Sequence, residues 1–175
     1  MEPAGGRGSA PGARAQRGPV ARLKKQARQA RSRRAVSCGG IVIRHSAAGP
    51  EIVLGKRRRE RNGVTWSLPK GTPNDDESAE QTALREVAEE SGLEVRIVAP
   101  VGPIEYFFSQ SGARVHKTVH YFLMEATGGS IEAHDHEFEE VRWVPLAAAL
   151  ELMTFPTERQ IVEQVLGQIR PAGAG

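Results

Sequence analysis

A helix with clearly marked ends is the feature that most limits what this chain of 175 residues can fold into. Ser78 and Gln81 have the spacing of a capping box, in which each side chain accepts a hydrogen bond from the other residue's backbone. Gly92 stands just past the last position that keeps the helical period, where helices commonly end. The pattern therefore predicts a helix over residues 78–91, with a polar turn before it.

Strand patterns lie on both sides of this helix. Residues 35–44 and 51–56 are apolar runs joined by a turn cluster, which predicts a hairpin. Residues 57–63 carry many charges and predict a loop. The remaining strand patterns occupy residues 93–108, 115–126 and 140–144.

A second helix pattern closes the chain. Residues 157–169 place Ile161, Val165 and Ile169 on one helical face. Strands interleaved with two helices indicate the α/β class, and we expect a three-layer α/β/α sandwich around a mixed sheet.

The first 34 residues differ in composition from the rest. They hold ten Lys or Arg and one acidic residue, whereas residues 35–175 hold fourteen basic and twenty acidic side chains. Large apolar side chains are almost absent from the first segment, so it cannot bury enough surface to offset the entropy cost of ordering. We therefore expect a disordered basic tail over residues 1–34, a globular domain over 35–170 and a flexible end over 171–175.

The basic tail has three interpretations. It could contact nucleic acid or another polyanion weakly, through the release of counterions. It could be a solvated extension without a specific partner, which is the simpler interpretation. It could also be an organellar transit peptide, because it is rich in Arg and poor in acids. The sequence leaves the oligomeric state open.

The lone cysteine and the hydropathy pattern bear on the compartment. Cys38 has no partner for an intramolecular disulfide, and its apolar neighbours favour a buried structural role. No apolar run reaches the ~18 residues that a membrane-spanning helix needs. We expect a cytoplasmic protein that does not contact membranes.

Three carboxylates share one face of the predicted helix. Glu86, Glu89 and Glu90 are spaced i, i+3 and i+4, so they fall within an arc of roughly 100°. Like charges at this spacing repel, and hard divalent cations such as Mg²⁺ prefer ligands of this kind. The spacing alone leaves two interpretations open, a cation site and a solvated acidic face.

The residues around these carboxylates form a longer pattern over residues 71–93. Its fixed positions are Gly71, Glu77, Arg85, Glu86, Val87, Glu89, Glu90, Gly92 and Leu93. This pattern resembles the signature of the Nudix hydrolase family at every specified position. The wider resemblance extends from about Ala35 to about Gly167.

The resemblance implies a Nudix-type sandwich with a loop-helix-loop catalytic motif, and a role for each signature residue. The Gly71 carbonyl, Glu89 and Glu90 would bind Mg²⁺, with Mn²⁺ as a substitute. Glu86 would either bind metal or take the proton from the attacking water. Arg85 and Glu77 would form an ion pair that holds the loop against the helix, as groups that orient metal ligands often do.

The chain departs from the family in one detail of this motif. Residues 72–76 lack the Gly that members often have just before the glutamate matched by Glu77. Asp76 stands there instead, and Asp adopts the left-handed backbone conformation more readily than most residues. We therefore expect the turn to be kept.

Three patches resemble the diadenosine polyphosphate hydrolases of the family. They are residues 66–71, 116–122 and 136–143. In this resemblance Glu137 would reach the metal site from a loop as a catalytic group, and Lys70 and Lys117 would bind the phosphates. The alternatives are a solvated acidic run for Glu137 and a strand-edge lysine for Lys117.

Aromatic and histidine side chains on the predicted strands have structural alternatives as well. Tyr106, Phe107 and Tyr121 are candidates to stack on an adenine, although aromatic residues on strands more often belong to the core. His116 and His120 would share one face of a strand, and we favour a structural role for both.

The sequence thus predicts a Mg²⁺-dependent hydrolase that cleaves a phosphoanhydride bond in a nucleoside diphosphate derivative. The expected substrates are nucleoside or dinucleoside polyphosphates, such as diadenosine polyphosphates. A pyrophosphohydrolase of oxidised guanine nucleotides or of ADP-ribose is a second enzyme reading. A polyanion-binding regulatory protein with a vestigial site is the alternative outside catalysis.

Overall fold

A computed structural model of the chain describes residues 32–61 and 63–169. Most of the predicted tail over residues 1–34, and the predicted flexible end over 171–175, lie outside these described residues. From Arg33 onward the described residues form one compact body.

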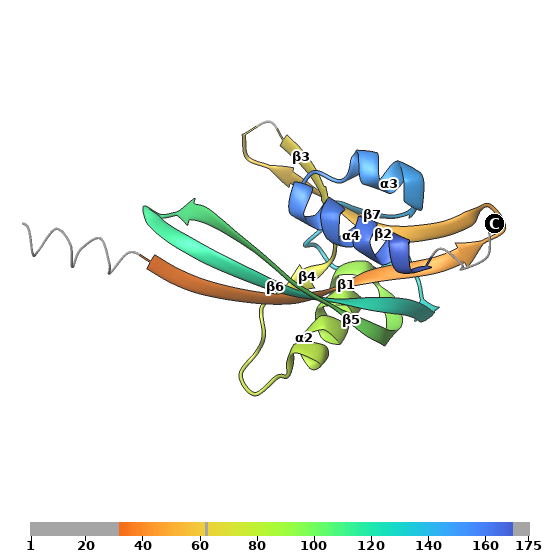
Figure 1. The fold of residues 1–175 in the computed structure, drawn as a ribbon, viewed down its shortest axis with the longest axis horizontal. Coiled ribbons are helices and arrows are strands. Elements are labelled where there is room, and N and C mark those ends of the chain that lie inside the picture. Colours follow the sequence, from red (N-terminus) through yellow and green to blue (C-terminus); the bar gives the residue numbers. More distant parts are fainter. Residues whose placement is uncertain (1–31, 62, 170–175) are drawn as a thin grey trace, which may run out of the picture. The chain divides into compact units, whose positions relative to one another are not determined.

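One sheet of seven strands forms the centre of this body. Its strands follow the order β3-β2-β1-β6-β5, while β4 pairs with β1 and β7 pairs with β2. β1 and β6 run in the same direction (Figure 1), whereas β2 is antiparallel to β1 and β5 is antiparallel to β6, so the sheet is mixed. The strands are β1 (Ser32–Ser46), β2 (Gly49–Arg59), β3 (Gly63–Ser67), β4 (Lys70–Gly71), β5 (Leu93–Gln110), β6 (Ala113–Gly129) and β7 (Glu140–Pro145).

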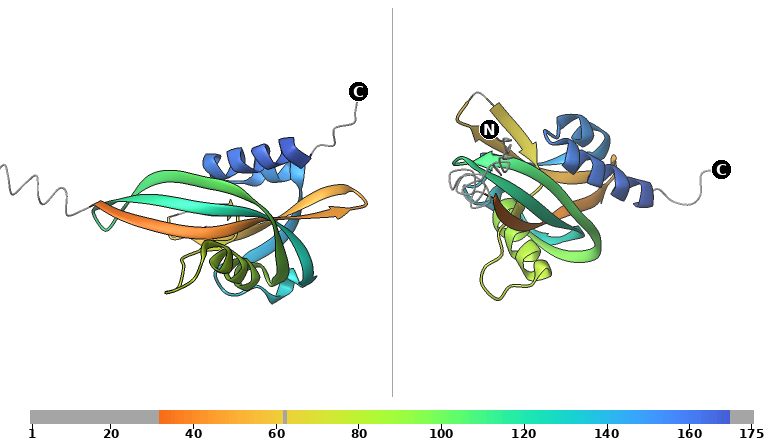
Figure 2. Two further views of the ribbon diagram at one scale, coloured as in Figure 1. Left: turned by 60° about the horizontal axis from the view of Figure 1, so that its bottom comes forward. Right: turned by 60° about the vertical axis from the view of Figure 1, so that its left-hand side comes forward.

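Helices cover both faces of the sheet, as predicted. The first, α2 (Ala79–Ser91), lies on one face, and α3 (Leu146–Leu152) and α4 (Pro156–Ile169) lie on the other (Figures 1 and 2). A short 3-10 helix, Ile131–Ala133, precedes β7. Among the described residues, no helix has the length and apolarity to cross a bilayer.

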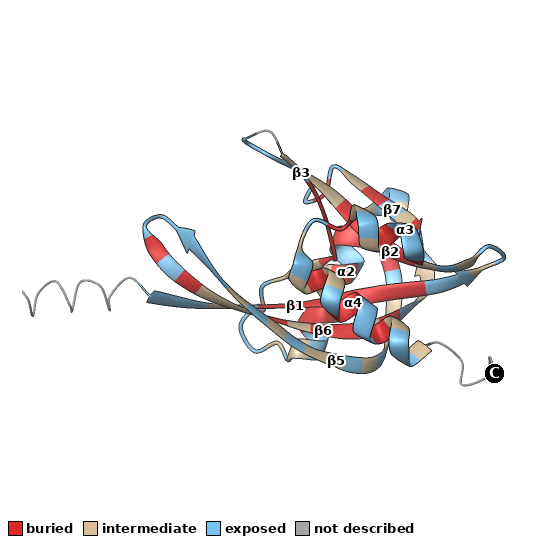
Figure 3. Ribbon diagram, turned by 45° about the horizontal axis from the view of Figure 1, so that its top comes forward, coloured by how far each residue is buried: buried red, intermediate tan, exposed pale blue. Residues whose placement is uncertain are grey.

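The alternation of side chains along the central strands produces two separate cores. Ile41 and Ile43 of β1 face α3 and α4, whereas Val42 between them faces α2. Tyr121 and Phe122 of β6 divide in the same way. Because both faces are covered, the middle of β1 and β2 is buried on both sides (Figure 3). This explains why these strands are almost continuously apolar.

The helix over 78–91 and the later helix are confirmed, but the loop predicted over 57–63 is wrong in part, and one helix was not predicted. Residues 57–59 are not a loop, because β2 continues through Arg59 and pairs with β3. Their charges are tolerated since acidic groups compensate them, as where Arg58 Nη2 lies 3.0 Å from Glu139. The helix α3 was not predicted, because its seven residues are too few to show a period and it is anchored by only two buried side chains, Leu146 and Ala149.

The packing of β2 yields a stability prediction at Gly55. A Cβ at this position would lie 2.3 Å from the ring of Phe138, which is itself buried. The ring would have to move, so we expect Gly55→Ala to lower the free energy of unfolding by about 1–3 kcal/mol, the usual cost of overpacking. Denaturant unfolding measures this loss. Gly63→Ala is the matched control, because a Cβ there would meet, among the described residues, only Arg59 at 3.8 Å. Equal stability of both variants would contradict the prediction.

Candidate functional site

Local hydrogen bonds hold the acidic helix in place. The Ser78 hydroxyl accepts from the Gln81 N–H at 3.1 Å, and the Gln81 side chain accepts from the Ser78 N–H at 2.9 Å. At the other end Gly92 has φ 76°, in the left-handed region where Gly is favoured. Ala83 and Val87 lie on the inner face of this helix and are fully buried. The carboxylates at neighbouring positions are therefore fixed relative to the sheet.

The turn before the helix is kept, as expected from Asp76. Its φ is 67°, a left-handed conformation. The Glu77 N–H then donates to the Asn74 carbonyl at 3.2 Å, and the Asn74 N–H donates to the Glu77 carboxylate at 2.9 Å. The missing Gly is thus replaced by an Asp that adopts the same kind of backbone.

Arg85 connects the loop to the helix through the predicted ion pair with Glu77. Arg85 Nε and Nη2 lie 2.7 and 2.9 Å from the two Glu77 oxygens, a bidentate arrangement. The guanidinium also donates to the Thr72 carbonyl at 3.1 Å and to Glu86 at 2.8 Å. The hydrogen bond from Arg85, with that from the Asn74 backbone, lowers the pKa of Glu77 to about 2. Arg85 therefore fixes the position of both the loop and the Glu86 carboxylate.

Gly71 lies directly against Glu86. A Cβ on Gly71 would stand 2.0 Å from the carboxylate carbon of Glu86, so no larger residue fits without displacing that group. Pairing of β4 with β1 brings Gly71 opposite Cys38 and fixes its backbone. Cys38 itself is buried, in agreement with its predicted structural role.

Glu90 is the most buried of the three carboxylates. It is 3% exposed, and it accepts from the Lys70 N–H at 2.9 Å and from Arg57 Nη2 at 3.4 Å. Burial raises the pKa of Glu90 to about 7, because the two donors offset only part of the lost hydration. A carboxylate kept in such surroundings fits a site for a cation, which would compensate its charge.

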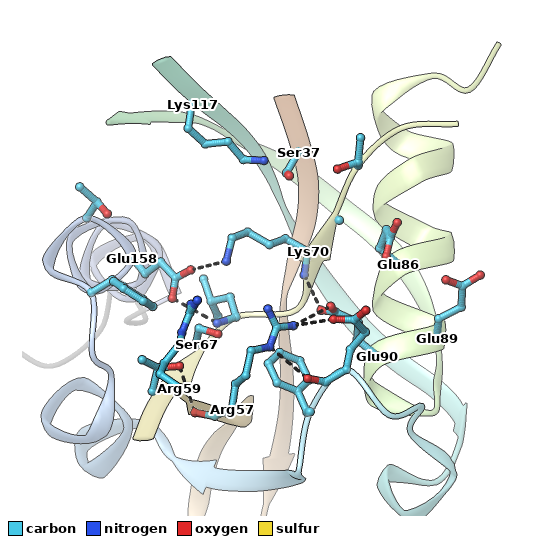
Figure 4. Close-up of a pocket in the computed structure, with 18 of the residues that line it drawn as sticks. Ser37, Arg57, Arg59, Ser67, Lys70, Glu86, Glu89, Glu90, Lys117 and Glu158 are labelled. Atoms are coloured by element: carbon cyan, nitrogen blue, oxygen red, sulfur yellow. Dashed lines mark hydrogen bonds and ion pairs between the residues drawn. The ribbon is translucent and has the colours of Figure 1, made fainter. Parts of the chain in front are cut away.

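Glu89 differs from its neighbours. Its side chain is half exposed, lies 3.3 Å from Arg85 Nη1, and stands on the outer side of the helix (Figure 4). Within residues 32–61 and 63–169, no three acidic, His or Cys side chains already converge as a metal cluster. The three glutamates and Gly71 nevertheless line one cavity, so the donor set suits a hard cation.

That cavity has a volume of about 1090 Å³, and four basic side chains, here called the basic wall, line it together with the acidic helix. The basic side chains that line it are Arg57, Arg59, Lys70 and Lys117. Burial, and to a lesser degree the nearby Lys70, lower the pKa of Lys117. The arrangement of acids facing bases suits a polyphosphate whose negative charge is shared between a bound cation and basic side chains.

The aromatic residues predicted to stack on a base differ in whether they line the cavity. Tyr106 lines the cavity, together with Phe108 and Phe155. Tyr121 does not: it is 1% exposed, and its hydroxyl donates to Glu158 at 2.8 Å, so the expected stacking of Tyr121 on a base is corrected to a core role. Phe107 is not among the residues that line the cavity, and its side chain is exposed.

The remaining candidates have structural partners. The ring of His116 stacks on Phe107 with 4.5 Å between centroids, in agreement with the structural role favoured for it. Glu137 lines the cavity, but Arg57 Nη2 lies 3.1 Å from its carboxylate and Arg57 Nε donates to its carbonyl at 3.0 Å. The structure thus brings Glu137 to the site on a loop tethered by Arg57.

Glu158 in the first turn of α4 was not identified as a site residue from the sequence. It lines the cavity and is buried. A signal existed: Glu158 shares the helical face of Ile161 and Val165, and a charge on a buried face is uncommon without a partner. Ser37 and Thr65 also line the cavity and carried no recognisable pattern.

The chain is similar to known proteins both in sequence and in fold. The family model described as "NUDIX domain" matches residues 33–165. A Mycobacterium tuberculosis protein named as the mutator protein MutT4 is 42% identical over 132 residues, covering 73% of this chain. An 8-oxo-(d)GTP phosphatase of Mycolicibacterium smegmatis is 30% identical over 99 residues, covering 57% of this chain. A solved binary complex of the Caenorhabditis elegans Ap4A hydrolase matches with a TM-score of 0.63 and 20% identity, covering 77% of this chain and 97% of that chain.

The structural match supports the α/β sandwich fold, and the family model covers most of the chain. The chain belongs to the Nudix hydrolase family. Members of this family generally use divalent metal ions such as Mg²⁺. The chain spans 52% of the length of the mycobacterial MutT4 protein and 29% of the phosphatase.

Proposed function

We propose that this protein hydrolyses a phosphoanhydride bond in a nucleoside diphosphate derivative with the help of Mg²⁺. The observation that carries the proposal is the buried Glu90 carboxylate, which shares one cavity with Glu86 and Glu89 and faces a basic wall. Acids on one side suit a cation, and bases on the other suit the phosphates that the cation also binds. Membership of the Nudix family supports the same reaction class.

The chain's own residues divide the work as follows. Glu86, Glu89, Glu90 and the Gly71 carbonyl would hold the cation, which when bound polarises the phosphate and lowers the pKa of a water. Arg85, fixed by Glu77, orients the Glu86 carboxylate. Either Glu86 or Glu137 would accept the proton of the attacking water.

The substrate-binding part of the proposal rests on the basic wall. Lys70 and Lys117 reach the cavity from different strands and would bind phosphates as point charges. Tyr106 would lie against the base. Four basic side chains suit a long phosphate chain, so dinucleoside polyphosphates remain the preferred substrates.

A second candidate is the hydrolysis of oxidised guanine nucleoside triphosphates. The observation that favours it is the 30% identity to a protein named 8-oxo-(d)GTP phosphatase. The likeness to the Ap4A hydrolase structure, at 20% identity, concerns the fold alone. The same proposal includes two further statements. The catalytic domain spans residues 35–170, and the protein acts in the cytoplasm.

A panel of nucleotides tests the proposal. Diadenosine polyphosphates, normal and oxidised nucleoside triphosphates and ADP-ribose are incubated with the full-length chain, with Mg²⁺ and with chelator, and products are separated by chromatography. We expect Mg²⁺-dependent cleavage, with the diadenosine compounds turned over fastest. Preference for 8-oxo-dGTP would support the second candidate, the hydrolysis of oxidised guanine nucleotides. Absence of any cleavage would favour a polyanion-binding protein with a vestigial site.

A further inference from the structure

A buried carboxylate with no part in the proposed chemistry lies across the cavity from the acidic helix. Glu158 is 2% exposed and accepts three hydrogen bonds. The donors are the Leu68 N–H at 3.2 Å, Lys70 Nζ at 3.2 Å and the Tyr121 hydroxyl at 2.8 Å. Burying a charge is unfavourable unless its partners compensate it. The three donors compensate the buried charge of Glu158, and Glu158 in turn restricts where these donors can lie.

The segment Leu68–Gly71 is held from both faces of the sheet. Glu158 of α4 accepts from the backbone of Leu68 and from the ammonium of Lys70. Glu90 of α2, on the opposite face, accepts from the backbone N–H of Lys70 at 2.9 Å. Figure 4 shows Lys70 between the two carboxylates, with its side chain extended toward Glu158. Two buried acids on different helices thus fix one residue at its backbone and at its charged end.

The strand beneath the segment adds a third restraint. The Gly40 N–H donates to the Pro69 carbonyl at 3.2 Å, and a Cβ on Gly39 would lie 2.3 Å from the same oxygen. The Gly pair of β1 therefore permits close approach of the two backbones. Little freedom remains for Lys70 apart from its side-chain torsions, and these are the freedom that Glu158 removes.

We propose that Glu158 is a positioning residue, which holds the ammonium of Lys70 at the cavity wall so that it meets the substrate's phosphates. This inference rests on the proposed function and extends it to a residue on α4. Lysine has a long flexible side chain with a compact charge, so a fixed partner restricts where that charge can stand. Ordering Lys70 before the nucleotide arrives lowers the entropy cost of binding.

A double-mutant cycle tests whether Glu158 acts through Lys70. The variants are Glu158→Gln, Lys70→Met and the double variant, assayed with the best nucleotide of the panel. We expect Glu158→Gln to raise KM about tenfold, the weaker end of what a charge-assisted hydrogen bond contributes, with kcat nearly unchanged. In the Lys70→Met background the same substitution should change KM by less than about twofold, because the group it positions is gone. A full tenfold effect in that background would overturn the proposal and point to direct contact between Glu158 and the nucleotide.

Controls separate positioning from stability. Glu163→Gln changes an exposed acid on the same helix and should leave KM unaltered. Tyr121→Phe removes a different donor to Glu158, and it should lower the melting temperature without the KM effect. A KM increase in Tyr121→Phe equal to that in Glu158→Gln would indicate a purely structural role. If Glu158→Gln does not fold, Glu158→Asp, which keeps the charge but retracts it, takes its place in the same cycle.

A binding measurement keeps this test distinct from the test of the reaction. If the wild-type chain cleaves no nucleotide of the panel, the proposed function fails, and the cycle is repeated with Kd values for α,β-methylene-ATP and Mg²⁺ by calorimetry. The same non-additivity of Glu158 and Lys70 in Kd would support the positioning role. Additive effects, or no binding by the wild-type chain, would overturn it.

Discussion

Glu90→Gln should reduce turnover by at least about a hundredfold while leaving the domain folded. A loss of this size is what the removal of one preorganised electrostatic group at a reacting centre causes. Gln has the shape of Glu and can still accept the hydrogen bond that the Lys70 N–H donates, so the local packing is kept. What it lacks is the charge that would bind the cation. Steady-state kcat at saturating Mg²⁺ measures the loss.

The same substitution should not destabilise the metal-free protein at pH 8. Since burial raises the pKa of Glu90 from 4.5 to about 7, the folded state binds more protons than the unfolded state between these values. The stability of the wild-type chain therefore falls as pH rises from about 4.5 through about 7, by up to about 3 kcal/mol from this group. Gln does not titrate, so Glu90→Gln should melt at the same temperature as wild type or higher at pH 8.

Glu80→Gln provides the matched control for this prediction. Glu80 lies in the first turn of the same helix and is exposed. Its substitution should leave turnover within about twofold of wild type, as is usual for surface changes away from a site. Near-normal turnover of Glu90→Gln would remove the basis for assigning this carboxylate to the cation.

The parts of the site that could be predicted from the sequence are those built by local interactions. The ends of α2 are set by Ser78 and Gln81 at its start and by Gly92 at its end, each within a few residues of the end it caps, and the capping bonds are formed as expected. The spacing of the three glutamates follows from helical geometry alone. The signature then gave each a chemical role by resemblance, which periodicity could not supply.

The parts that could not be predicted depend on contacts distant in sequence. Tyr106 and Tyr121 are both aromatic residues on strands, yet one lines the cavity and the other is buried against Glu158. Which of the two lines the cavity depends on how α4 packs over the sheet, and α4 begins 35 positions after Tyr121. The charge of Arg57 likewise suggested a loop, because its partners Glu90 and Glu137 lie 33 and 80 residues away.

Gly71→Ala should abolish most turnover for a steric reason, and it is the sharpest test of the loop-helix contact. The new methyl carbon would lie 2.0 Å from the carboxylate carbon of Glu86 and 2.2 and 2.3 Å from its oxygens. Glu86 must turn away and lose its 2.8 Å hydrogen bond to Arg85. We expect kcat to fall by about a hundredfold, comparable to the loss of a preorganised group.

The displaced carboxylate is the end of a flexible side chain, so this variant should remain nearly as stable as wild type. In this it contrasts with Gly55→Ala, where a buried aromatic ring has to move. Thermal melting of the two variants side by side measures the difference.

The effect of Gly71→Ala should also depend on Glu86. If the methyl group acts only by moving that carboxylate, Gly71→Ala combined with Glu86→Gln should lose no more turnover than the worse single variant. Multiplied losses would show instead that the methyl group disturbs the Gly71 carbonyl itself, so the cycle distinguishes between the two groups that meet at this contact. Normal turnover of Gly71→Ala would contradict the close approach of loop and helix on which the proposed cation site depends.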